Sequence, residues 1–79
     1  KLEEVIIQCK CWKNTVGPDV VREMLGTLVE NDTVEITLRG AIYTTSKFSQ
    51  EAVALATKHG IELIDGEKWG QLSNQLLHA

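Results

Sequence analysis

Apolar positions along the chain follow two patterns that alternate, a continuous run and a helical spacing. Residues 5–7 read Val-Ile-Ile and open a strand that we expect to end near Cys11. Pro18 then suits the first turn of a helix. Beyond it the apolar residues recur three and four positions apart, at Val20, Val21, Met24, Leu25, Leu28 and Val29. The pattern predicts a strand followed by a helix with one apolar face, which covers a sheet.

The same alternation returns twice in the rest of the chain. A β-rich run predicts a second strand near residues 39–45, and Ser49 is a good cap for a helix that runs to about residue 58 and stops at Gly60. Residues 61–64 predict a brief third strand. A last helix is marked by apolar residues at helical spacing, namely Trp69, Leu72, Leu76 and Leu77. Such alternation favours an α/β fold with a three-stranded, mainly parallel sheet in β-α-β-α-β-α order.

Four residues carry packing expectations. Gly26 inside the first helix permits that helix to approach a strand closely, and Trp69 is expected in the core because tryptophan is highly buried on average. Cys9 and Cys11 share one face of the first strand, a geometry that hardly permits a disulfide between them. We therefore expect two buried free thiols, which fit a reducing, cytoplasmic location.

Length and charge narrow the function classes. The 79 residues allow one domain, spanning residues 1–79, and hold no apolar stretch near the roughly 20 residues of a membrane span. The first strand signal begins within three residues of Lys1, so we expect a fragment of a larger protein. The net charge of −3 gives no general attraction for nucleic acid, so any DNA contact must be local. Candidates for it are Lys10, Lys13, Arg22, Arg39 and Lys47.

Gln8 and Lys10 place an amide and an ammonium on one face of the first strand, where a buried strand should hold only hydrocarbon. They stand about 6.6 Å apart, a separation across which one phosphate and one cation could be shared. The alternative is a strand end that surfaces into water with Lys10 solvated. Thr44, Thr45 and Asp65 also fall at carboxyl ends of strands, the usual place for a site in an open α/β sheet. The threonines either offer hydroxyls to phosphate or serve as turn residues.

Four ordered blocks resemble the Mrr-like (type IV) restriction endonuclease domain of the PD-(D/E)xK nuclease superfamily, with its amino-terminal part missing. The blocks are Gln8-Cys9-Lys10 with Trp12, Val16-Gly17 before Val20-Val21-Arg22-Glu23, Gly40-Ala41-Ile42-Tyr43-Thr44-Thr45 with Phe48-Ser49, and Ile61-Glu62-Leu63-Ile64-Asp65-Gly66. The resemblance implies a partial restriction-endonuclease-like fold and magnesium-dependent hydrolysis of phosphodiester bonds in double-stranded DNA. Many Mrr-like members act on modified DNA.

Carried over residue by residue, the resemblance puts Gln8 in the place of the usual acidic metal ligand. Cys9 would lend its backbone carbonyl to the Mg²⁺ ion, and Lys10 would be the motif lysine that orients water or neutralises charge in the transition state. The family's metal-binding aspartate belongs to a preceding strand that this chain does not contain. Asp19 and Glu23 could come near through the fold, but acidic residues are favoured at a helix amino terminus in any case. We therefore expect the parent to be a DNA endonuclease and this chain alone to be inactive.

Two other readings stay open. The chain could be a non-catalytic scaffold or DNA-recognition module derived from the same fold, or an unrelated small α/β domain with chance similarity. Trp12 either flanks DNA or seals the end of the sheet. We expect no membrane contact. The resemblance implies that the missing part holds the strands that flank the first strand, so this strand has an open edge, which predicts a homo-oligomer.

Overall fold

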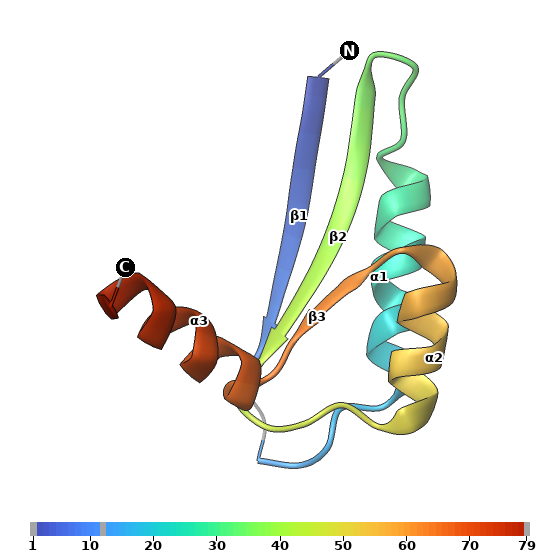
Figure 1. Cartoon of the computed structure of the whole chain (residues 1–79). Helices are drawn as coiled ribbons and strands as arrows, with labels where there is room; N and C mark the ends of the chain where they lie inside the picture. The colour runs from blue at the N-terminus through green and yellow to red at the C-terminus, as the bar shows by residue number, and fades with distance from the viewer. Residues whose placement is uncertain (1, 12, 79) are drawn as a thin grey trace.

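Strands and helices alternate along the chain, as the apolar patterns predict (Figure 1). The computed structural model describes residues 2–11 and 13–78, with side chains described up to residue 72 and at residue 74. The elements are β1 (Leu2–Lys10), α1 (Pro18–Glu30), β2 (Ile36–Thr44), α2 (Gln50–His59), β3 (Glu62–Ile64) and α3 (Gly66–His78). The first two strands begin about three residues earlier than their apolar runs. They do so because Leu2 already pairs with Ile36, and pairing continues as far as Lys10 with Thr44.

The three strands form one parallel sheet in the order β1-β2-β3, which confirms the predicted α/β class. Each crossover moves the chain one strand further in the same direction. Crossover helices of one handedness then fall on the same face of the sheet. Figure 1 shows α1 and α2 together on that face, while α3 projects from the opposite side near the end of β3.

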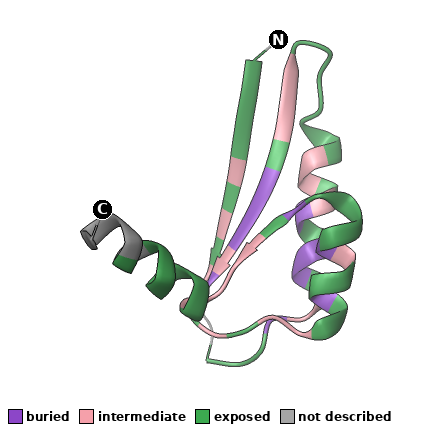
Figure 2. Cartoon of the chain, in the orientation of Figure 1, coloured by how far each residue is buried: buried purple, intermediate pink, exposed green. Residues whose placement is uncertain are grey.

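The core lies between the sheet and the helices α1 and α2 (Figure 2). Its buried residues are Val16, Val20, Val21, Met24, Ile42, Ala52, Ala56 and Ile61. The close approach of α1 to the sheet occurs at Gly40, where a Cβ would lie 3.0 Å from the Cγ of Met24. The expectation for Gly26 is therefore wrong, because a Cβ there would meet no atom within 4 Å and the residue faces solvent.

The opposite face of the sheet is largely uncovered, and this overturns two packing expectations. Cys9 and Cys11 are exposed rather than buried, because both crossover helices cover the other face. Trp69 is not a core residue either. It is 50% exposed and touches the sheet through an edge-to-face contact with Tyr43, with ring centroids 5.6 Å apart.

Local signals fix the ends of α2 as predicted. The Ser49 side chain accepts a hydrogen bond from the backbone N–H of Ala52, and Gly60 ends the helix with a φ of 69°. No helix in the described part of the chain has the length and apolar character needed to cross a membrane.

Candidate functional site at the carboxyl ends of the strands

Two loops meet at the carboxyl ends of β1 and β2. The Val16 N–H donates to the Lys47 carbonyl at 2.7 Å, and the Ser49 N–H donates to the Val16 carbonyl at 2.9 Å. The Ser46 hydroxyl donates to the Asn14 carbonyl at 2.7 Å. These bonds hold the loop after β1 against the loop after β2, so residues far apart in sequence share one edge of the sheet.

Gln8 and Lys10 lie at the end of β1 on the face that α1 covers. Their neighbours across the sheet are Ile42, which is fully buried, and Thr44. Both side chains are half-buried, whereas Cys9 between them is exposed on the opposite face. The amide and the ammonium therefore open to the same side, and Cys9 can contribute there only through its main chain.

Glu23 of α1 contacts the first of these residues directly. Its Oε1 accepts a hydrogen bond from the Nε2 of Gln8 at 2.9 Å. Reading Glu23 as an ordinary acidic residue of a helix amino terminus is wrong, because it lies beyond the first turn of α1 and reaches the sheet. Asp19 does fit that reading, since it lies in the first turn and accepts from Arg22 at 3.0 Å. The signal in the sequence was the position of Glu23, directly before the buried Met24 on the sheet-facing stripe.

The donor set around Gln8 suits a hard cation. It offers an amide oxygen from Gln8 and a main-chain carbonyl from Cys9, both oxygen ligands of the kind that Mg²⁺ prefers, while the Glu23 carboxylate binds the Gln8 amide nitrogen. Among the side chains that the structure describes, no three of Asp, Glu, His or Cys gather closely enough to hold an ion. An ion at Gln8 would keep several water ligands, which is usual for Mg²⁺.

The five candidate cations divide into two groups. Lys13 and Lys47 are exposed on the two joined loops, at the same edge of the sheet as Lys10. Arg22 is paired with Asp19 on α1. Arg39 lies beside Val5 on the uncovered face and pairs with Glu3 at 3.5 Å. Only the lysines therefore share the edge that holds Gln8.

Two polar residues at this edge have structural roles. Thr44 is fully buried, and its hydroxyl accepts from the Ser46 N–H at 3.2 Å and lies 3.1 Å from the Ser46 hydroxyl. It shapes the turn after β2 and is not available to a phosphate. The Asp65 Oδ1 accepts from the Lys68 N–H at 2.7 Å and so caps the start of α3. Thr45 remains exposed, and Trp12 lies outside the described residues.

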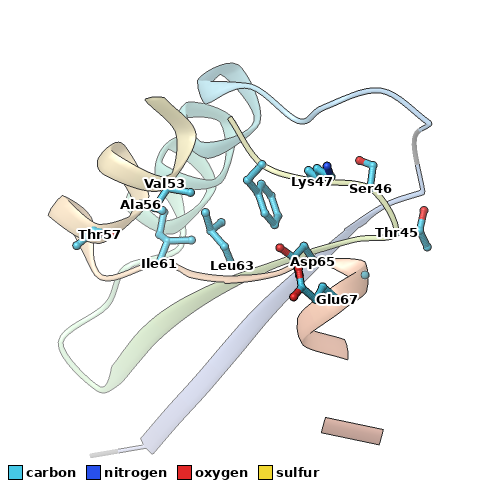
Figure 3. A pocket seen from close by; sticks show the side chains of 12 residues that line it. Thr45, Ser46, Lys47, Val53, Ala56, Thr57, Ile61, Leu63, Asp65 and Glu67 are labelled. Carbon is cyan, nitrogen blue, oxygen red and sulfur yellow. The ribbon is translucent and has the colours of Figure 1, made fainter. Parts of the chain in front are cut away.

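A hollow of about 730 Å³ lies next to this edge, between α2, β3 and the start of α3 (Figure 3). Its lining includes the apolar residues Phe48, Ala56, Ile61 and Leu63, together with the charged residues Lys47 and Asp65. Gln8 and Lys10 do not line it. The hollow is thus a neighbour of the Gln8 site rather than part of it.

Comparisons with known proteins agree with this arrangement. The sequence model of a family described as restriction endonuclease, Mrr_cat, matches residues 1–73. The chain belongs to this family. It is also 37% identical over 68 residues to the type IV methyl-directed restriction enzyme EcoKMrr of Escherichia coli (strain K12). That match covers 85% of this chain and 21% of the relative, so the chain spans about a fifth of the relative's length. No solved structure is matched significantly.

Family membership excludes the reading of an unrelated α/β domain with chance similarity. It identifies a nuclease-type fragment with a three-stranded parallel sheet. The half-buried Gln8 and Lys10 lie within the matched residues.

Proposed function

We propose that the chain is part of a magnesium-dependent endonuclease that hydrolyses phosphodiester bonds of double-stranded DNA. One observation carries the proposal most: Gln8 and Lys10 share a half-buried face at the carboxyl end of β1, with the Glu23 carboxylate 2.9 Å from the Gln8 amide. The amide oxygen supplies a cation ligand and the ammonium supplies a positive charge, and a phosphodiester site needs both.

Each residue has a proposed role. Gln8 through its amide oxygen and Cys9 through its backbone carbonyl would hold Mg²⁺, which when bound polarises a phosphoryl oxygen and activates water. Lys10 orients the attacking water or stabilises the charge that develops on the phosphate. The named relative is methyl-directed, and we extend modified DNA to this chain as its proposed substrate.

We propose that residues 1–79 form one partial endonuclease-like domain that is inactive alone. Near Gln8 the described contacts supply one carboxylate, that of Glu23, and it is bonded to the Gln8 amide nitrogen. Magnesium sites of phosphoryl-transfer enzymes commonly use one or two carboxylates together with substrate phosphates. The aspartate that the family places on a neighbouring strand would complete the ligand set in the whole protein.

The test is Mg²⁺-dependent nicking of plasmid by the natural full-length protein, compared with its Lys10→Ala variant. Loss of a group that stabilises transition-state charge typically lowers kcat by about 10²–10³-fold. Lys68→Ala is the matched control, because Lys68 pairs with Glu62 through a contact of 3.7 Å and does not belong to the site. Equal cleavage by the wild type and Lys10→Ala would defeat the role of Lys10.

The same experiment separates the enzyme from a non-catalytic scaffold or DNA-recognition module. DNA binding without cleavage at any Mg²⁺ concentration would favour the scaffold. The net charge of −3 favours this second, non-catalytic function, since a DNA-binding surface is usually positive.

Two further proposals concern the surroundings of the chain. We propose that it self-associates through the outer edge of β1, which pairs with β2 on its other side. We also propose a reducing location such as the cytoplasm, because Cys9 and Cys11 are free thiols exposed to solvent.

A further inference from the structure

The Gln8 amide has two chemically different ends, and the contact with Glu23 distinguishes them. A carboxylate only accepts hydrogen bonds, whereas an amide donates from nitrogen and accepts at oxygen. The 2.9 Å contact with Glu23 therefore requires that Gln8 present its Nε2. Because Nε2 binds Glu23, the Oε1 of Gln8 must point away from Glu23, since both atoms are attached to the same carbon in different directions.

We infer that Glu23 is a positioning residue, which holds the Gln8 amide so that its oxygen, not its nitrogen, is presented to a cation. The inference rests on the proposed function and deepens it, because it explains how a neutral amide can replace an acidic ligand. Either oxygen of a carboxylate can bind an ion, but a rotated amide would offer its NH₂ group and repel the ion. A site built on glutamine therefore needs a second residue that fixes the amide.

Helix α1 gives Glu23 a fixed base for this role. Val20 is 4% exposed and Met24 is 1% exposed, so both are packed in the core one turn before and one residue after Glu23. The Thr27 hydroxyl donates to the Glu23 carbonyl at 3.1 Å. Arg22, the neighbouring cation, is engaged with Asp19. The helix thus sets the backbone of Glu23, and the hydrogen bond restrains the Gln8 amide relative to that helix.

The experiment compares Glu23→Ala and Glu23→Gln by NMR of the ¹⁵N-labelled chain. Glu23→Ala removes the acceptor, and we expect the side-chain NH₂ resonances of Gln8 to move to the positions of a solvated glutamine. Glu23→Gln keeps an oxygen acceptor, so these resonances should stay near their wild-type positions. Glu30→Ala is the control, because it removes an exposed carboxylate from the far end of α1.

A Mg²⁺ titration followed at the backbone amides of Gln8 and Lys10 gives the second readout. Residues that orient a metal ligand typically change metal affinity by about 10–100-fold, and we expect roughly a tenfold weakening for Glu23→Ala. Glu23→Gln should recover most of that affinity. Equal weakening by both variants would overturn the inference, since Glu23 would then act through its charge rather than by orienting the amide.

The two readouts separate this inference from the proposed function. If Mg²⁺ moves no resonance of the wild-type chain, magnesium binding at Gln8 fails. The Gln8 NH₂ resonances still decide whether Glu23 holds the amide, and wild-type positions in Glu23→Ala would refute that. Methyl resonances of the buried Ile42 report in every variant whether the fold is intact.

Discussion

Gly66 lies where the chain leaves β3 and enters α3, and it makes room for the backbone of the loop after β2. A Cβ at this position would stand 2.7 Å from the carbonyl oxygen of Thr45, closer than any ordinary contact. The Gly66 N–H also donates to the Ser46 carbonyl at 3.4 Å. The missing side chain therefore lets the loop of Thr45 and Ser46 lie directly against the start of α3.

We predict that Gly66→Ala destabilises the fold by about 1–3 kcal/mol, as overpacking against atoms that cannot rotate away usually does. Gly70→Ala is the matched control within the same helix, because a Cβ there meets nothing within 4 Å. It should raise the free energy of unfolding by up to about 1 kcal/mol through better helix propensity. Urea unfolding measures both. Stabilisation by Gly66→Ala would contradict the close approach.

At the scale of elements, periodicity was sufficient for the order of strands and helices, because each element's apolar pattern is local. It could not tell which face of the sheet the helices would cover. That depends on both crossovers moving the chain in one direction, a property of the whole sheet. For this reason the thiols of Cys9 and Cys11 and the ring of Trp69 are more exposed than expected.

The candidate site was likewise predictable from the sequence only in part. The alternation of β1 placed Gln8 and Lys10 on one face from sequence alone, because it needs only the period of a strand. The contact between Gln8 and Glu23 joins residues 15 positions apart on different elements. It follows from how α1 sits on the sheet, which no local pattern specifies. The roles of Gln8, Cys9 and Lys10 stay predictions.

Strand β1 presents an outer edge and an apolar face to solvent. Val5 is 56% exposed and Ile7 is 65% exposed. Two copies of β1 paired antiparallel about Ile7 would place Glu4 of each copy opposite Lys10 of the other, Val5 opposite Cys9, and the two Ile7 residues opposite each other. This complementarity favours a second copy of the chain as the partner of the edge.

We predict that the 79-residue chain forms a concentration-dependent dimer, and that Val5→Lys shifts it to monomer because an edge lysine opposes strand pairing. Val53→Lys is the control, an identical change at a valine 47% exposed on α2, and should leave the dimer intact. Size-exclusion chromatography with light scattering over a range of concentrations measures the mass. A monomer at high concentration in the wild type would refute the pairing.

At the scale of the whole molecule, the sign of the charge conflicts with a polyanionic substrate. The chain has eight basic and eleven acidic residues, so its net charge does not attract DNA. Any attraction must therefore come from the local positions of its cations. Arg22 and Arg39 each pair with a carboxylate, at 3.0 Å and 3.5 Å. Lys13 and Lys47 stand on the two loops joined at the site edge.

We therefore predict that Lys13→Ala/Lys47→Ala in the full-length protein weakens DNA binding and flattens its salt dependence. Removing one lysine that neutralises a phosphate should lower the slope of log K against log salt by about 0.9, and removing both should lower it by nearly two.

Arg22→Ala/Arg39→Ala is the control, because it also removes two positive charges from the chain. Fluorescence anisotropy at several salt concentrations gives both slopes. If net charge governed binding, the two double variants would lose slope equally. A decrease confined to the lysine pair means that DNA approaches the carboxyl ends of the strands, where Gln8 and Lys10 lie.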